Sequence, residues 1–253
     1  MIDGLIVMYV FLIGLVFGSF FNVVGLRVPN GQSIIAPRSH CPSCKRTLTG
    51  IDLIPVVSYI FLRGKCRTCE ARVSPLYPTI ELVTACLYVG VWLVFGWSTE
   101  VIVAWIFVSL LVIITVSDLS TMLIPNKILL FFGTIIFLFR LTIAPLHPWW
   151  DVFVGAAVGF SLLLIIAIVS KGGMGGGDIK LFAVLGMYFG WQDVLLAFFF
   201  SVFVGAVIGG IGLLIGKVKR KSPMPFGPAI AIGSVLTLFF GEEIVAWYLS
   251  FLT

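Results

Sequence analysis

Long apolar runs are the feature of this sequence that most restricts its fold. Two segments, 179–191 and 229–252, are less clear than the rest, because the first is short and the second contains two glutamates. With 60% hydrophobic and only 11% charged residues, the chain could not cover a water-exposed surface. We therefore predict an all-α polytopic membrane protein with about eight transmembrane helices. The clear runs, each able to cross about 30 Å of hydrocarbon, are 5–26, 76–97, 101–117, 128–144, 152–169 and 194–216.

The basic residues predict the orientation of these helices. Lys and Arg in short loops are retained on the cytoplasmic side of a membrane. With eight crossings and an external N-terminus, every Lys and Arg except Arg140 falls on one side, which we expect to face the cytoplasm. The first run follows Asp3 rather than a basic region, so we predict a retained helix and not a cleaved signal peptide. The opposite side receives Asp3, Glu100, Asp151 and Asp193.

Residues 28–75 form the one large segment outside the apolar runs, and they are rich in Gly, Pro, Ser and basic residues. We predict a first transmembrane helix at 1–27, a cytoplasmic domain at 28–75 and a membrane catalytic domain at 76–253. The net charge of +5 follows from membrane topology, so we expect no nucleic-acid partner. The basic run 217–221 is typical of a topological anchor that favours anionic membrane lipid.

Four cysteines within 28–75 form two CxxC pairs, Cys41 with Cys44 and Cys66 with Cys69. A CxxC turn directs two thiolates toward one point, and two such turns supply the four-sulfur tetrahedron that zinc prefers. Four sulfurs leave no open coordination position, so the predicted zinc is structural. The alternatives are free thiols or disulfides, and a reducing cytoplasm disfavours disulfides. His40 could also be a ligand, although a solvated neighbour is the simpler interpretation.

Two aspartates adjoin apolar runs, where a carboxylate is costly and often functional. Asp118 ends the run at 101–117 and Asp178 precedes the segment 179–191. On the predicted topology both lie at the cytoplasmic boundary. Two carboxylates that share one proton can act as general base toward water and as general acid toward a leaving amine. We therefore predict an aspartyl dyad that hydrolyses peptide bonds.

The sequence GMGGGDIKLF places Gly175 and Gly177 directly before Asp178. Because glycine lacks a Cβ, we expect this loop to adopt positive φ and to admit an extended substrate backbone. Other interpretations remain open at this point. Each aspartate alone could be a helix cap or turn residue, and the pair could serve a proton-coupled membrane carrier. A zinc-bound membrane scaffold would explain the cysteines but not the paired acids.

Several motifs together resemble the bacterial type IV prepilin peptidases, which are GxGD membrane aspartyl proteases. They occur in the order GSFFNVVGLRVP, RSHCPSCKRTL, SDLSTMLIPN, GMGGGDIKLFAVLGMYFGW and PFGPAIAIG, so the resemblance runs through nearly the whole chain. It implies that Asp118 and Asp178 are the catalytic pair and that Gly175 and Gly177 form the GxG before the second acid.

The resemblance also implies a substrate class and a second activity. The substrates would be prepilins or pseudopilins, which lose a short leader at the cytoplasmic face of the bacterial cytoplasmic membrane. The new N-terminus would then be methylated with S-adenosylmethionine, because in this family the four cysteines accompany the form with both activities. Cleavage would need no metal. The sequence contains no strand-turn-helix fingerprint that would identify residues for the methyl donor.

Overall fold

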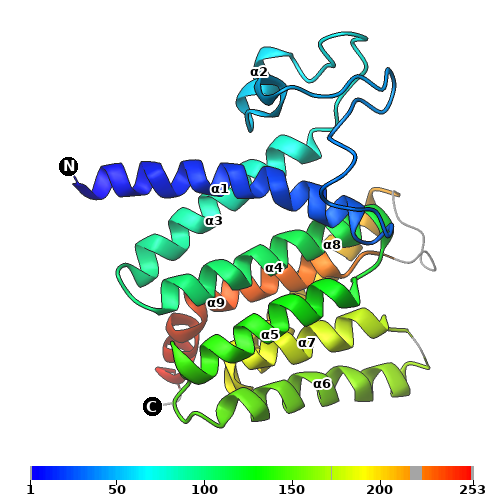
Figure 1. The fold of residues 1–253 in the computed structure, drawn as a ribbon. Helices are drawn as coiled ribbons and strands as arrows, with labels where there is room; N and C mark the ends of the chain where they lie inside the picture. Colours follow the sequence, from blue (N-terminus) through cyan, green and yellow to red (C-terminus); the bar gives the residue numbers. More distant parts are fainter. Residues whose placement is uncertain (1, 172, 217–223, 252–253) are drawn as a thin grey trace. The chain divides into compact units, whose positions relative to one another are not determined.

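The computed structural model describes residues 2–171, 173–216 and 224–251, so the basic run 217–221 lies outside the described residues. Within these ranges the chain forms helices and turns but no β-strand, which confirms the predicted all-α class (Figure 1). The elements are α1 (Ile2–Arg27), η1 (Gly50–Leu53), α2 (Val57–Phe61), α3 (Leu76–Phe95), α4 (Glu100–Thr121), α5 (Asn126–Thr142), α6 (Asp151–Val169), α7 (Gly176–Phe189), α8 (Trp191–Leu214) and α9 (Gly227–Leu249).

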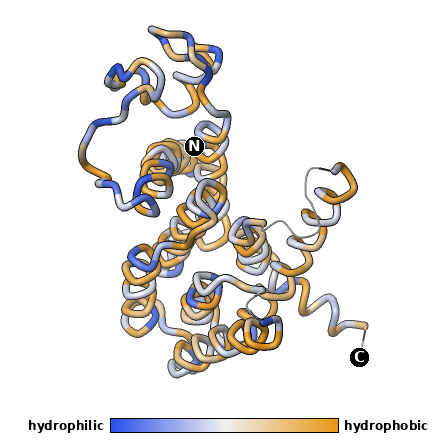
Figure 2. Tube along the Cα trace, turned by 90° about the vertical axis from the view of Figure 1, so that its right-hand side faces the viewer, coloured by the Kyte–Doolittle hydropathy of each residue, from blue (hydrophilic) through white to orange (hydrophobic). Residues whose placement is uncertain are grey.

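Six of the described helices, α1, α3, α4, α6, α8 and α9, are long and apolar enough to cross a membrane. The chain is therefore a multi-pass membrane protein, and Figure 2 shows how far hydrophobic residues dominate its helices. Helix α5 has 17 residues and α7 has 14. At 1.5 Å per residue α7 spans only about 21 Å, less than the hydrocarbon core. Every predicted apolar segment thus becomes a helix, but eight crossings are not confirmed.

The chain divides into two compact units, Met1–Trp97 and Ser98–Thr253. In the first unit, α1 and α3 pack along each other (Figure 1). Two glycines of α1 allow this contact. A Cβ at Gly14 would lie 2.6 Å from the Cα of Ala85, and one at Gly18 would lie 2.7 Å from the Cα of Glu81. Helix α3 therefore packs as part of the first unit, whereas the functional boundary predicted at residue 75 stays a prediction.

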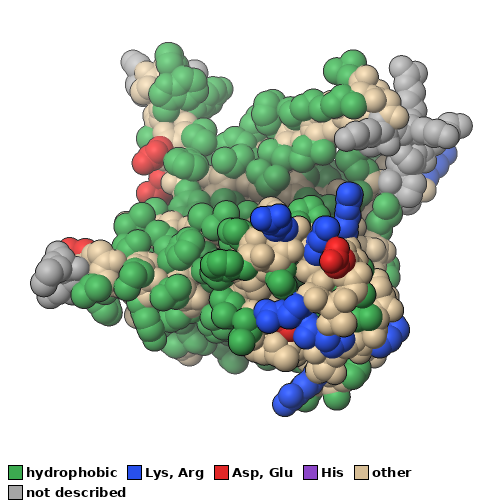
Figure 3. Space-filling view, turned by 90° about the horizontal axis from the view of Figure 1, so that it is seen from above, with side chains coloured by type: hydrophobic (Ala, Val, Ile, Leu, Met, Phe, Trp, Pro, Cys, Tyr) green, Lys and Arg blue, Asp and Glu red, His purple; other side chains and the backbone are tan. Residues whose placement is uncertain are grey.

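Residues 28–75, which connect α1 to α3, carry little regular structure beyond η1 and α2. Isolated bridges between His40 and Thr47 and between Lys65 and Arg72 close two short turns. Helix α2 has only 5 residues, so it cannot span a membrane. Figure 3 shows that Lys and Arg side chains gather over this loop, while the neighbouring helices present mainly hydrophobic side chains.

In the second unit, α6 packs on α7 and α8 packs on α9, while α4 contacts both α5 and α9. The backbones of α6 and α7 touch at Gly155 and Gly186, where an added Cβ on either glycine would overlap the carbonyl of the other. Helix α4 is buried along most of its length. In its last turn Asp118 is buried, whereas the next two residues, Leu119 and Ser120, are exposed.

A buried arginine joins three helices of the second unit. Arg140 of α5 donates from Nη1 to both carboxylate oxygens of Glu100 at 2.8 Å and to the Ala144 carbonyl at 3.1 Å. Its guanidinium also lies 4.6 Å from the ring centre of Tyr188, which stacks on Phe107 with ring centres 3.8 Å apart. Arg140 is the one basic residue predicted to face away from the cytoplasm, and the structure supplies its counter-charge.

Candidate active site and metal centre

Asp118 lies in the last turn of α4, and the residue is only 5% exposed. The backbone N–H of Gly227, the first residue of α9, donates to Asp118 Oδ2 at 2.6 Å. A Cβ at Gly227 would lie 2.8 Å from the same oxygen, so this contact requires glycine. The carboxylate is held at the start of α9, where free backbone N–H groups favour negative charge. The Asp118 side chain does not cap its own helix, which ends at Thr121 with Met122 as the C-cap residue.

Asp178 lies in the first turn of α7 and is partly exposed. It is not the N-cap, because Gly175 holds that position. The Asp178 backbone N–H donates to the Gly175 carbonyl at 3.1 Å. A Cβ at Gly175 would lie 2.9 Å from Asp178 Oδ2. Each of the two aspartates thus adjoins a glycine at the start of a helix.

The structure brings these two predicted residues together: their carboxylates are close enough to repel each other. The start of α7 reaches Asp118 because it lies against the segment that follows α4. A Cβ on Gly177 would lie 2.8 Å from the Cβ of Ile124, and Lys180 Nζ donates to Asn126 Oδ1 at 2.9 Å. Residues more than fifty positions apart thereby form one acidic pair, in which one carboxylate is buried and the other is partly open.

The expected conformation of the glycine loop is wrong. Gly175 has φ −70°, and Gly177 lies within α7, so neither uses the positive φ that only glycine adopts readily. Their lack of a Cβ matters for space instead, because Gly175 adjoins the carboxylate and Gly177 adjoins Ile124. Gly176 between them faces open space. The predicted role of Gly175 and Gly177 toward a substrate stays a prediction.

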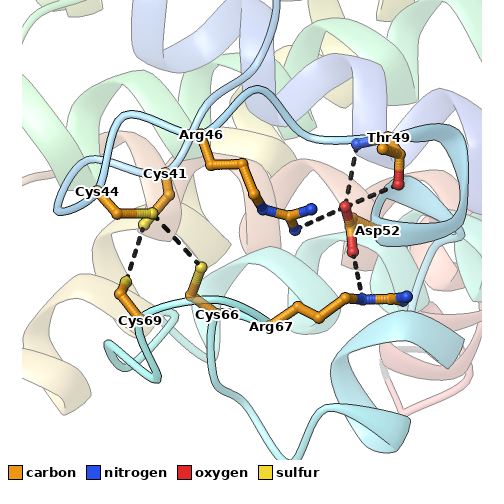
Figure 4. Close-up of polar contacts among 8 residues, drawn as sticks. All are labelled: Cys41, Cys44, Arg46, Thr49, Asp52, Cys66, Arg67 and Cys69. Carbon is orange, nitrogen blue, oxygen red and sulfur yellow. Dashed lines mark hydrogen bonds and ion pairs between the residues drawn. The ribbon is translucent and has the colours of Figure 1, made fainter.

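The four cysteines of the loop form one cluster, with all sulfurs within 4.8 Å of one another (Figure 4). The Sγ atoms of Cys41 and Cys69 are 3.7 Å apart, and those of Cys44 and Cys66 are 4.0 Å apart. A tetrahedral zinc ion with Zn–S bonds of about 2.3 Å separates its sulfurs by about 3.8 Å. The cluster therefore has the size of a zinc site, and its cysteines are not joined by disulfides. His40 is not part of it and contacts the Arg38 carbonyl.

The two CxxC turns, which we call knuckles, share one backbone geometry. In each, the N–H of the first cysteine donates at 2.9 Å to the carbonyl five residues later, and the residue after the second cysteine has positive φ. The sequence shows only the cysteines in common, so this short structural repeat is not evident from it. The corresponding residues are Cys41 and Cys66, Cys44 and Cys69, Lys45 and Glu70, and Arg46 and Ala71.

Backbone donors in the knuckles favour the thiolate form that a metal requires. The N–H groups of Cys69 and Thr68 lower the pKa of the Cys66 thiol to about 6. In the first knuckle, the N–H groups of Cys44 and Ser43 likewise lower the pKa of the Cys41 thiol. Thiolates are the species that bind zinc, so the backbone prepares Cys41 and Cys66 for it. At Cys69 the Ala71 N–H acts in the same direction, but burial and the neighbouring thiols raise the pKa to about 11.

A buried carboxylate beside this cluster was not predicted. Asp52 of η1 has a side chain only 3% exposed. Its Oδ2 accepts from Thr49 N at 3.0 Å, Thr49 Oγ1 at 2.8 Å and Arg46 Nη2 at 2.8 Å, while Arg67 Nε lies 3.1 Å from Oδ1 (Figure 4). The N–H of Thr49 lowers the pKa of Asp52 against the effect of burial, and the Arg46 guanidinium lowers it further. The only sequence signal was an acidic residue within a basic loop.

Comparison with known proteins identifies the family. Residues 12–95 match the bacterial peptidase A24 N-terminal domain, and residues 105–210 match the type IV leader peptidase family. The chain is 48% identical over 239 residues to a prepilin leader peptidase/N-methyltransferase of Bacillus subtilis, covering 94% of this chain and 96% of that relative. The chain belongs to the type IV leader peptidase family. The resemblance inferred from the motifs is therefore confirmed.

More distant members of the family match over nearly the same length. Proteins of the same name from Aeromonas salmonicida and Pseudomonas aeruginosa are 35% and 34% identical, covering 95% of this chain and 93% and 92% of theirs. No similar solved structure was found. The cysteine cluster lies within the first matched region, and Asp118 and Asp178 lie within the second.

Proposed function

We propose that this protein is a membrane aspartyl endopeptidase that removes the short leader of prepilins or pseudopilins and then methylates the new N-terminus. Membership of the type IV leader peptidase family and the names of its relatives support both activities. The single observation that carries the peptidase assignment is the pairing of Asp118 with Asp178. A catalytic pair of acids accounts for two neighbouring carboxylates that form no ion pair with a Lys or Arg of the described residues.

The proposed mechanism uses both carboxylates and one shared proton. The ionised carboxylate takes a proton from a water molecule, and the water oxygen attacks the carbonyl carbon of the scissile bond. The protonated carboxyl group donates its proton to the carbonyl oxygen. As the tetrahedral intermediate collapses, the first carboxyl group passes the proton taken from water to the leaving amine, and the second recovers its proton from a hydroxyl of the intermediate, which restores the shared proton. The Gly227 N–H fixes the rotamer of Asp118, so the Asp118 carboxylate needs no reorientation between the two steps.

We place the active site at the cytoplasmic face of the bacterial cytoplasmic membrane. Lys180 and Lys127 lie at the same helix ends as the two aspartates, through the contact of Lys180 with Asn126. At the other end of α4 and α5, Arg140 is neutralised by Glu100. By the positive-inside rule the aspartate end faces the cytoplasm. A prepilin leader is basic and stays in the cytoplasm in this family, so its cleavage point would reach these acids.

The methyl donor would be S-adenosylmethionine, and the four cysteines would hold a structural zinc ion. Zinc binding supplies folding free energy to a small domain, which suits a loop with few helices of its own. Cys41, Cys44, Cys66 and Cys69 would be the ligands. We propose that this ordered domain supports methyl transfer, while the aspartates perform cleavage. Membrane lipid surrounds the apolar helices.

The test is cleavage and methylation by purified protein in detergent or nanodiscs. Asp118→Asn and Asp178→Asn preserve side-chain size and remove the ionisable carboxyl group. We expect both variants to lose prepilin cleavage and to retain methylation of a substrate that was cleaved beforehand. Asp193→Asn, in the first turn of α8, is the matched control and should cleave normally.

Either outcome of this test is informative. Near-normal cleavage by Asp118→Asn or Asp178→Asn would refute the aspartyl mechanism. A proton-coupled carrier is the other function that paired acids could serve. It predicts pH-driven uptake into proteoliposomes that the same substitutions abolish, with no cleavage by the wild type.

A further inference from the structure

The Asp52 side chain, which belongs to neither knuckle, contacts both of them. Its Oδ2 accepts from Arg46, which belongs to the first knuckle, and its Oδ1 faces Arg67, which lies between the two cysteines of the second. Figure 4 shows the carboxylate between the two arginines, to one side of the four sulfurs. The knuckles have no β-strand pairing with each other, so this side chain supplies a connection that the backbone does not.

Both arginines are tied directly to metal-ligand residues. The Arg46 carbonyl accepts the Cys41 N–H at 2.9 Å, so fixing Arg46 also fixes the acceptor that orients Cys41. The Arg46 guanidinium further interacts with the Cys66 sulfur in the opposite knuckle. Arg67 is bonded in sequence to Cys66. A movement of Asp52 would therefore be transmitted to cysteines of both pairs.

Comparison with a nearby ion pair shows that Asp52 does not form an ordinary exposed salt bridge. Lys65 and Glu70 lie 3.6 Å apart, and their side chains are 51% and 79% exposed. Such pairs contribute little to stability because water screens them. The Asp52 side chain is 3% exposed, accepts three hydrogen bonds and lies beside a second arginine. A buried carboxylate with this many partners fixes the geometry of the groups around it.

Charge gives the arrangement a second effect. Four thiolates around one divalent zinc ion carry a net negative charge, which a low-dielectric site disfavours. Asp52 neutralises one of the two arginines and leaves one positive charge beside the sulfurs. Groups outside the ligand shell that orient and neutralise ligands typically change metal affinity by about 10- to 100-fold when they are removed.

We propose that Asp52 is a positioning residue for the metal centre, which holds the two cysteine knuckles in register through Arg46 and Arg67. The inference rests on the proposed zinc site. It assigns to Asp52 no contact with zinc, prepilin or methyl donor, and it predicts a loss of metal affinity rather than a direct loss of catalysis.

The experiment measures zinc affinity of the full-length purified protein by competition with a chromophoric chelator. Asp52→Asn should weaken zinc binding roughly 10- to 100-fold. Glu70→Gln removes the same charge from the same loop, directly after a ligand, but breaks only an exposed ion pair. We expect this control to change the affinity by less than about threefold.

Replacing zinc by cobalt gives an absorption spectrum that a general loss of protein stability would not change. The ligand-field bands of bound Co²⁺ report the tetrahedral geometry of the sulfurs, so Asp52→Asn should alter their position or intensity while Glu70→Gln should not. If Asp52→Asn does not fold, Arg67→Gln decides, because its side chain is 48% exposed and tolerates substitution. It should also weaken zinc binding.

The results distinguish the positioning role of Asp52 from the proposed zinc site itself. A wild-type protein that binds no zinc overturns the proposed metal site itself. A wild type that binds zinc, with Asp52→Asn and Arg67→Gln both matching Glu70→Gln in affinity and spectrum, overturns the positioning role of Asp52 alone.

Discussion

Replacing Gly227 by alanine tests whether the geometry around Asp118 serves catalysis. The added Cβ would lie 2.8 Å from Asp118 Oδ2, whereas ordinary contacts begin at 3.4 Å. The oxygen or the start of α9 must therefore move by roughly 0.6 Å, the difference between these distances. Either movement lengthens the 2.6 Å hydrogen bond that the Gly227 N–H donates. Gly227 has no positive φ, so alanine introduces no strain of that kind.

The expected loss follows from that hydrogen bond. A hydrogen bond to a charged group contributes about 1.5 to 3 kcal/mol, which corresponds to roughly 10- to 150-fold in rate if it acts in the transition state. We expect kcat/KM for prepilin cleavage to fall within this range. Methylation of a previously cleaved substrate should stay unchanged, because the proposed methyl transfer does not use Asp118.

The assay compares cleavage rates of purified variants with equal thermal unfolding midpoints. Gly176→Ala is the matched control, since a Cβ there meets nothing within 4 Å although Asp178 is only two residues away. It should cleave within about threefold of the wild type. If Gly227→Ala does so as well, the contact between Gly227 and Asp118 does not orient a catalytic carboxylate, and the reasoning is refuted.

Two further predictions concern stability and metal. Glu100→Gln leaves Arg140 buried without its counter-charge and should destabilise the fold by about 2 kcal/mol or more, a value reduced because Glu100 is 35% exposed. The unfolding midpoint in detergent measures this, and exposed Glu243→Gln is the control; equal midpoints would contradict it. Removal of zinc by a chelator should expose residues 28–75 to limited proteolysis and reduce methylation, while prepilin cleavage persists. Unchanged proteolysis would show that no metal orders the loop.

The helices were predictable because each depends on a long apolar run, which is a local property of the sequence. The number of crossings was not, because helix length also depends on where backbone geometry ends a helix. Helix α7 stops at Gly190, which has φ +82°, and α5 begins only after Pro125. Both helices are therefore shorter than a typical span. Helix α9 continues through Gly241 and two glutamates, although these made its segment less clear in the sequence.

The acidic pair was predictable because carboxylates are rare beside apolar runs, and the cysteines because they form two CxxC pairs. In both cases the side chains themselves carry the chemistry. Gly227 was missed because its contribution is a backbone N–H, 109 residues away from the acid that it holds. The motif PFGPAIAIG contributed only to the resemblance. Asp52 was missed for a related reason, since the pairing of one acid with two arginines depends on how the loop folds. Positions that act through geometry alone leave little trace in a single sequence.

The structure also changes the explanation for the glycines of this site. Gly175 and Gly227 each adjoin an aspartate, and at each a Cβ would lie within 3 Å of an oxygen of that carboxylate. Each acid thus lies against a glycine at the start of a helix, and these two helix starts are far apart in the sequence. Glycine is required here first by the aspartates, whose side chains fill the space, and not by an unusual φ. On this basis a glycine that touches neither acid, such as Gly176, should tolerate alanine even within the GxGD motif.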